Sequence, residues 1–219
     1  MEKVKHEIPP VYDENSKILI LGSFPSVKSR ENQFFYHHPQ NRFWKTLAAV
    51  VGCDTPISIE EKKKFNIISA CYPEGHIENK RIDIEIDNMK RKINSGTSSF
   101  ISQLFFDNNI YYDFLDKINQ NGINTPIQAG IMPVINKKQI ERITKLCGAK
   151  IPVKFSKIMK RYEYSPEALR EAGIAYAVEQ IIDLASSGVQ GIHIYTMNNP
   201  YVARKIKENI KTIIKTINN

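Results

Sequence analysis

The stretch Pro126-Ile127-Gln128-Ala129-Gly130-Ile131-Met132-Pro133 decides the fold class, because it predicts a short buried strand that a helix over 138–147 follows directly. A brief apolar run bounded by prolines is typical of such a strand. The other predicted strands lie at 67–71, 99–105 and 191–195, and the other predicted helices at 79–94, 111–121, 152–161, 166–187 and 200–217. Strands that alternate with helices pair in parallel through right-handed crossovers, so we expect an α/β fold with four βα units from residue 65 onward.

A further strand is predicted upstream of these units. Lys17-Ile18-Leu19-Ile20-Leu21 is a short apolar run that ends at Gly22, and the spacing of apolar residues over 42–51 predicts a helix. Four βα units alone leave an open sheet edge, which natural proteins cover or pair. The strand at 17–21 would cover that edge in an open, five-stranded, flavodoxin-like parallel sheet.

Composition excludes several classes of protein. The 219 residues, 42% of them hydrophobic, suffice for one domain or slightly more. No apolar run reaches the roughly 20 residues of a membrane span, and the first ten residues lack the apolar region of a secretory signal. The three cysteines are far apart, without a CxxC motif or a Cys/His cluster. We therefore expect a reduced cytoplasmic protein with no membrane contact, no disulfide framework and no metal site.

The net charge leaves two interpretations open. Lysines and arginines exceed aspartates and glutamates by 31 to 23, and residues 65–219 carry six of the eight excess positive charges. Five basic residues and one acid fall between Arg204 and Lys215. Such a helix is most often a solvated face, and the alternative is a phosphate-rich partner. DNA binding stays open on this evidence but is not favoured.

Polar residues follow the predicted strands. In parallel α/β folds the chemistry sits at the carboxyl ends of the strands. The segments that begin there contain amides, a tyrosine, a histidine and few carboxylates: Tyr72-Pro73-Glu74-Gly75-His76, Gln103 with Asp107, Asn136 with Gln139, and Thr196-Met197-Asn198-Asn199. This set suits the binding of a polar heterocycle better than acid–base hydrolysis, although any one of these residues is more often a loop cap.

The helix at 79–94 presents a second polar group. Glu85, Asn88, Arg91 and Lys92 are spaced three and four residues apart, which places them on one helical face. Arginine and lysine together could bind a pyrophosphate. The plainer interpretation is a solvated face.

From about residue 65 to 214 the sequence resembles the methylenetetrahydrofolate reductase family. Four motifs carry the resemblance, in order: Ala70-Cys71-Tyr72-Pro73-Glu74-Gly75-His76, Ser102-Gln103-Leu104-Phe105-Phe106-Asp107, Ala129-Gly130-Ile131-Met132-Pro133-Val134 and His193-Ile194-Tyr195-Thr196-Met197-Asn198. The resemblance implies a (β/α)8 barrel that binds FAD. It also implies reduction of methylenetetrahydrofolate to methyltetrahydrofolate with NAD(P)H as donor.

The resemblance assigns a cofactor role to six residues. Tyr72 and His76 match positions that contact the flavin. The residues that match the helix holding the adenosine and pyrophosphate are Glu85, Asn88, Arg91 and Lys92, with Glu85 in place of a more usual Asp.

Two glutamines match substrate positions. Gln103 matches a glutamine that contacts folate or nicotinamide, and Gln139 matches a second substrate position. Asn199 stands where the family often has an arginine, which is a departure from the pattern.

The matched region corresponds to strands five to eight of that barrel, so it is half of a TIM barrel. Strands one to four and the catalytic glutamate of the family belong before residue 65, and the reductase interpretation therefore assigns no catalytic residue within this chain. It implies weak flavin binding at best and no folate reduction. Two half-barrels closing into eight strands would form a homo-oligomer through their edges.

Residues 17–62 resemble a different group, the uracil-DNA glycosylase superfamily and its hypoxanthine-DNA glycosylase branch. The matching motifs are Leu19-Ile20-Leu21-Gly22-Ser23-Phe24-Pro25-Ser26 and Phe35-Tyr36-His37-His38-Pro39-Gln40-Asn41-Arg42-Phe43-Trp44. The resemblance implies a pocket for an extruded deaminated base, hypoxanthine or uracil. Gly22, Ser23 and Tyr36 would line that pocket and Asn41 would position water.

Together the two resemblances predict a chimera of two pieces, a glycosylase-like fragment over 1–64 and a reductase-like half-barrel over 65–219. Three hypotheses follow. The chain is a flavin-dependent oxidoreductase fragment that binds a folate substrate, a DNA glycosylase, or an inactive scaffold.

Overall fold

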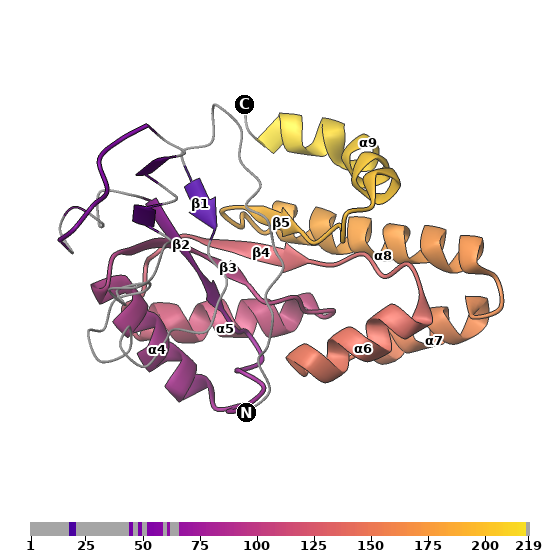
Figure 1. Cartoon of the computed structure of the whole chain (residues 1–219). Coiled ribbons are helices and arrows are strands. Elements are labelled where there is room, and N and C mark those ends of the chain that lie inside the picture. The colour runs from indigo at the N-terminus through magenta and orange to yellow at the C-terminus, as the bar shows by residue number, and fades with distance from the viewer. Residues whose placement is uncertain are drawn as a thin grey trace, which may run out of the picture. The chain divides into compact units, whose positions relative to one another are not determined.

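A computed structural model describes residues 18–20, 44–45, 48–49, 52–58, 61 and 66–217 (Figure 1). The chain divides into two compact units. Unit 1 comprises residues 1–69 and 88–100, and unit 2 comprises residues 70–87 and 101–219. Strands β2 (Asn66–Cys71) and β3 (Thr97–Ser102) and helix α4 (Ile82–Asn94) pass from one unit into the other.

Unit 1 contains the predicted N-terminal strand. β1 (Ile18–Ile20) pairs in parallel with β2, with Ile18 opposite Asn66 and Ile20 opposite Ile68. The β1 prediction is therefore confirmed, and this strand covers the edge of β2. Between β2 and β3, the buried hydroxyl groups of Ser69 and Thr97 are hydrogen bonded at 2.8 Å.

Unit 2 contains the other elements. They are α5 (Asn108–Gln120), β4 (Ile127–Ile131), α6 (Lys137–Cys147), α7 (Val153–Tyr162), α8 (Pro166–Ser186), β5 (Ile192–Ile194) and α9 (Pro200–Ile217). β5 pairs in parallel with β4, with Gly130 opposite His193. The α/β prediction and its parallel pairing are confirmed.

The described strands follow chain order along the sheet, β1-β2-β3-β4-β5. A flavodoxin-like sheet instead has the order 2-1-3-4-5, with a reversal next to its first strand. The flavodoxin-like alternative is therefore wrong for the described strands. A sequential parallel order is consistent with part of a barrel.

Two element boundaries differ from the sequence prediction for local reasons. β3 ends at Ser102 rather than at residue 105, because the side-chain oxygen of Gln103 accepts a 2.9 Å hydrogen bond from the Leu104 N–H and draws that donor out of the ladder. α4 begins at Ile82 rather than at residue 79. Asn79 lies in a turn, where its N–H donates to the His76 carbonyl at 2.8 Å.

Unit 2 has an aromatic and aliphatic core beneath α6, α7 and α8. Its buried members are Leu104, Phe106, Met132, Val134, Ile140, Phe155, Met159 and Leu169. The Phe155 ring stacks on the rings of Phe106 and Tyr176, with centroids 5.4 and 4.4 Å away. Helix α8 approaches this region closely at Gly173, where a Cβ atom would lie 1.7 Å from the Val134 carbonyl oxygen.

No helix in the described part of the chain is long and apolar enough to cross a bilayer. The described residues also contain no group of three His, Cys, Asp or Glu side chains placed to bind a metal ion.

Candidate functional site

The candidate site is the carboxyl edge of the strands in unit 2. Parallel strands bring their carboxyl ends to one edge of a sheet, so segments that are far apart in the sequence meet there. The four segments are 72–76 after β2, 103–107 after β3, 132–139 after β4, which includes the first turn of α6, and 195–199 after β5. All of them belong to unit 2, and we call this region the carboxyl-edge site.

Tyr72 and His76 lie together at this edge. Their rings meet edge to face with centroids 4.8 Å apart. Burial raises the pKa of the Tyr72 phenol, and the negative charge of Glu85 raises that pKa further. Glu85 is itself only 2% exposed. Both effects keep the Tyr72 phenol protonated at physiological pH.

The end of β5 is tied to β3 across β4. The Tyr195 hydroxyl donates a 2.9 Å hydrogen bond to the Ser102 carbonyl, and the Gly130 N–H donates to the Ser102 hydroxyl at 2.8 Å. A Cβ atom on Gly130 would lie 2.2 Å from the Ser102 carbonyl oxygen and 2.8 Å from the Tyr195 ring. Only glycine leaves room for the Tyr195 ring to cross β4. The hydrogen bond between Tyr195 and Ser102 then holds the ends of β3 and β5 in place at the carboxyl-edge site.

Both predicted substrate glutamines have hydrogen-bonding capacity left over. The Gln103 oxygen is used by the Leu104 N–H, which leaves its amide N–H groups to donate. The Gln139 side-chain oxygen is buried, and among the described residues no donor reaches it. A buried acceptor without a donor costs about 1–3 kcal/mol, which makes this oxygen a natural contact for a ligand.

Other polar residues at this edge cap helices. The Asp107 carboxylate accepts from the Asn109 N–H at 3.0 Å at the start of α5. The Asn136 side chain accepts from the Gln139 N–H at 2.6 Å at the start of α6. The Asn199 side chain accepts from the Val202 N–H at 3.3 Å. For these three residues the helix-cap interpretation is the correct one.

The loop after β5 departs from ordinary backbone geometry. Met197 and Asn198 have φ values of 52° and 58°, in the left-handed region that side chains other than glycine rarely adopt. Two consecutive residues of this kind store local strain, which concentrates at functional sites. Just before the loop, His193 packs against the Tyr195 ring at 4.7 Å, and burial lowers its pKa.

The remaining predicted cofactor residues lie in unit 1. Arg91 and Asn88 share α4, and the Arg91 guanidinium donates a hydrogen bond to the Asn88 side-chain oxygen. Lys92 follows Arg91 near the end of this helix. Gly22, Ser23, Tyr36 and Asn41, which form the glycosylase-like pocket of the sequence analysis, fall outside the described residues.

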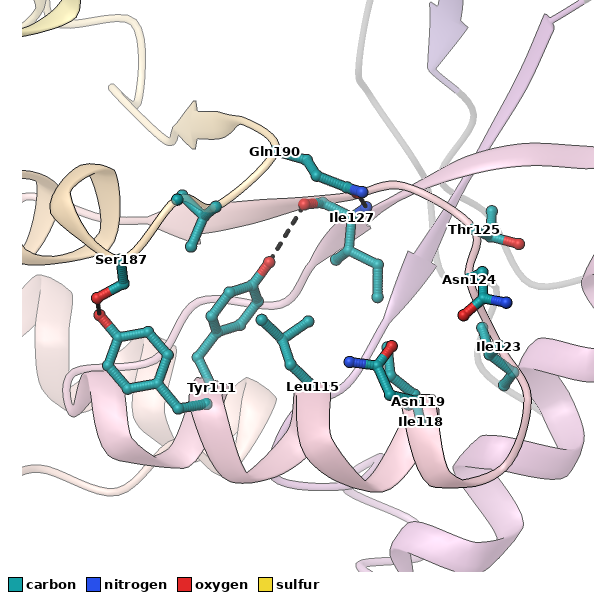
Figure 2. A pocket seen from close by; sticks show the side chains of 13 residues that line it. Tyr111, Leu115, Ile118, Asn119, Ile123, Asn124, Thr125, Ile127, Ser187 and Gln190 are labelled. Atoms are coloured by element: carbon teal, nitrogen blue, oxygen red, sulfur yellow. Dashed lines mark hydrogen bonds between the residues drawn. The ribbon is translucent and has the colours of Figure 1, made fainter. Parts of the chain in front are cut away.

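A cavity of about 290 Å³ lies at the other edge of unit 2, beside the start of β4 (Figure 2). The Tyr111 hydroxyl donates to the Ile127 carbonyl at 3.2 Å, and the Gln190 side-chain oxygen accepts from the Ile127 N–H at 3.1 Å. These bonds supply β4 with partners where it begins. None of the predicted site residues lines this cavity. It lies at the amino-terminal end of β4, and in parallel α/β folds that end of the strands serves stability while the carboxyl end carries the chemistry.

Sequence reasoning missed the roles of Ser102, Gly130 and Tyr195. The available signal was the glycine inside a predicted strand, which indicates a close approach of another group. The identity of that group depends on a contact between residues 93 positions apart.

Comparisons with known proteins show the family to which this chain belongs. The family model described as methylenetetrahydrofolate reductase matches residues 36–211. The chain belongs to the methylenetetrahydrofolate reductase family. This match begins within the segment that the sequence analysis assigned to a glycosylase-like fragment, and the division at residues 64 and 65 remains a prediction.

Curated members of the methylenetetrahydrofolate reductase family are similar over part of their length. The 5,10-methylenetetrahydrofolate reductase of Pectobacterium carotovorum is 32% identical over 140 residues, which cover 64% of this chain and 47% of that protein. Methylenetetrahydrofolate reductase 1 of Schizosaccharomyces pombe is 33% identical over 162 residues, or 71% of this chain and 27% of that protein. The chain thus spans about half or less of the length of these relatives.

A solved structure shares the fold. It is a protein from Clostridium thermocellum that binds two copies of 5-methyl-5,6,7,8-tetrahydrofolic acid, with a TM-score of 0.52 and 18% sequence identity. The similarity covers 71% of this chain and 57% of the other.

Proposed function

We propose that the carboxyl-edge site of unit 2 binds a reduced folate, and that the chain takes part in methylenetetrahydrofolate reductase chemistry. The observation that carries this proposal is the buried Gln139 oxygen, which lacks a donor among the described residues. Family membership and the folate-binding structural neighbour support the same ligand class.

The chemistry of the site matches a pterin ring. A pterin presents several N–H donors and a carbonyl acceptor in one plane, and amide groups can pair with both kinds of atom. Gln139 offers an acceptor, and Gln103 offers donors. The aromatic rings at this edge supply apolar surface on which a planar ligand can stack.

The predicted cofactor residues have the chemistry that FAD requires. Tyr72 and His76 in unit 2 would contact the isoalloxazine ring, and the carboxylate of Glu85 suits ribose hydroxyl groups. Within unit 1, considered by itself, Arg91 and Lys92 carry the positive charge that suits a pyrophosphate, and the Arg91 guanidinium donates a hydrogen bond to Asn88. Bound FAD would supply the hydride-transfer chemistry, with NAD(P)H as the electron donor. The chain's own residues would bind the cofactor, orient it and keep Tyr72 protonated.

Thermal melting with each ligand tests both parts of the proposal. A ligand that binds only the native state adds about 2.7 kcal/mol to the free energy of unfolding at a hundredfold excess over its Kd. The melting midpoint rises as a result. We expect 5-methyltetrahydrofolate and FAD each to raise the midpoint, and the two shifts to be measurable independently. A folate shift without an FAD shift would limit the proposal to folate binding. No folate shift would contradict it.

A further inference from the structure

The net charge of the chain is concentrated in one helical hairpin. Residues 137–163, which comprise α6, the loop after it and α7, contain nine lysines and arginines and two glutamates. Their net charge is +7, against +8 for the whole chain. Both helices lie within unit 2 (Figure 1). Ile140 of α6 and Phe155 of α7 belong to one buried core. We call residues 137–163 the basic hairpin.

Most of this positive charge is not neutralised. Lys137 pairs with Glu163 at 2.6 Å, and Lys154 pairs with Glu179 of α8 at 2.5 Å. Within the part of the chain that the structure describes, seven exposed cations have no carboxylate oxygen within 4.0 Å. They are Lys138, Arg142, Lys145, Lys150, Lys157, Lys160 and Arg161. Like charges at this density repel one another, so the binding of an anionic partner lowers the free energy of this surface.

Two exposed tyrosines stand at the end of α7. Tyr162 is the last residue of the helix and is 40% exposed, and Tyr164 follows the C-cap residue Glu163 and is 92% exposed. Lys157, Lys160 and Arg161 lie in the last two turns of α7, and the turn that holds Tyr164 begins where this helix ends. Cations beside an exposed ring are the combination that binds a phosphate backbone and stacks its bases.

The same residues fit a lipid surface poorly. A helix that lies on a membrane presents a broad apolar face to the acyl chains. The large apolar residues of α7, Phe155 and Met159, are instead buried in the core of unit 2. The exposed apolar residues of the hairpin, Leu146 and Val153, stand next to the turn between the helices and form no continuous face.

We propose that the basic hairpin binds single-stranded nucleic acid, with phosphates on the cations of α6 and α7 and a base stacked on Tyr164. Gln139 of the carboxyl-edge site stands in the first turn of the same hairpin. The cations that the test changes, Lys157, Lys160 and Arg161, instead lie on α7.

The test measures binding of a fluorescein-labelled oligothymidine to the full chain by anisotropy over a range of salt concentrations. The hairpin variant carries Lys157→Gln, Lys160→Gln and Arg161→Gln. The matched control carries Lys207→Gln, Lys211→Gln and Lys215→Gln on α9, which changes the net charge equally and also affects only exposed residues. A melting curve for each variant verifies that the fold is retained.

We expect the wild-type chain to bind with an affinity that falls steeply as salt rises. Because each phosphate contact to a single strand contributes about 0.7 to the slope of log K against log salt, the hairpin variant should lose about 2 from that slope. The α9 control should keep the wild-type slope. Tyr164→Ala should weaken binding by about fivefold to a hundredfold without altering the slope, because stacking is not electrostatic.

Three results would overturn the proposal. The first is an absence of binding to the oligothymidine. The second is an equal loss in the hairpin variant and the α9 control, which would show that only net charge matters. The third is tighter binding to polyglutamate or to phosphatidylserine vesicles than to the oligothymidine, which would assign the surface to an acidic protein or a membrane.

Discussion

The Tyr195 hydroxyl donates a hydrogen bond of 2.9 Å to the backbone carbonyl of Ser102, and so joins the end of β5 to the end of β3 over the intervening strand β4. Burial raises the pKa of the Tyr195 phenol well above its ordinary value, so the group remains a donor at any physiological pH. The carboxyl edges of three strands are thereby held in a fixed relation, which a binding site for a rigid planar ligand requires.

Removing this donor should destabilise the chain moderately. Tyr195→Phe keeps the ring and deletes the hydroxyl, so we expect a loss of about 1 kcal/mol in the free energy of unfolding. For a protein of this size that corresponds to a fall of about 2–4 °C in the melting midpoint. A midpoint equal to that of the wild type would show that the bond contributes nothing.

Filling the space under Tyr195 should be more damaging. Gly130→Ala places a methyl group 2.2 Å from the Ser102 carbonyl oxygen, which is backbone and cannot move aside without shifting a strand. We expect a loss of about 1–3 kcal/mol by overpacking, measured by denaturant titration. The matched control is Gly191→Ala, whose nearest neighbour is the flexible Gln128 side chain at 3.1 Å. Equal losses in the two variants would contradict this account of Gly130.

His193 should make stability depend on pH. Burial lowers its pKa below the unfolded value of about 6.5, so in the window between the two values the unfolded chain binds the proton and the folded chain does not. Its contribution is therefore fully present above about pH 6.5 and is lost as the pH falls through that window.

The measurement is the free energy of unfolding of the wild type and of His193→Gln at a series of pH values between about 4 and 8. The difference between them should change with pH below about 6.5 and stay constant above it. A difference that is constant over the whole range would show that His193 titrates alike in both states.

The buried side-chain oxygen of Gln139 should lower the free energy of unfolding of the unliganded chain. Gln139→Met keeps the length of the side chain and removes the buried oxygen that has no donor among the described residues. Because an unpaired buried acceptor costs about 1–3 kcal/mol, we expect the unliganded variant to melt at or above the wild-type midpoint. A clear fall would mean that this oxygen already has a stabilising partner.

The strands and helices of unit 2 could be predicted because their signals are local. The run 126–133 is bounded by prolines, and each predicted helix of unit 2 appears within a few residues of its expected position. The misplaced boundaries reflect short-range side-chain bonds, such as the one between the Gln103 oxygen and the Leu104 N–H, that periodicity does not register.

The tie at the carboxyl edge could not be predicted in the same way. Gly130 signalled a close approach, but its partners Ser102 and Tyr195 come from strands whose order is known only from the fold. Likewise, the sequence gives no sign that Asp107 and Asn136 are helix caps while Gln139 retains a buried acceptor without a donor, because the two situations differ only in three-dimensional contacts. The concentration of charge over 137–163 was visible in the sequence, but its significance depends on which cations are paired.

The central claim is that the carboxyl-edge site binds a reduced folate through Gln139, and calorimetric titration of the full chain with 5-methyltetrahydrofolate tests it most directly. The matched control for Gln139→Met is Gln120→Met, an exposed glutamine at the end of α5. We predict saturable binding by the wild type and by Gln120→Met, and a loss of at least about tenfold in affinity for Gln139→Met. Absence of binding to the wild type, or equal affinities for all three proteins, would contradict the claim.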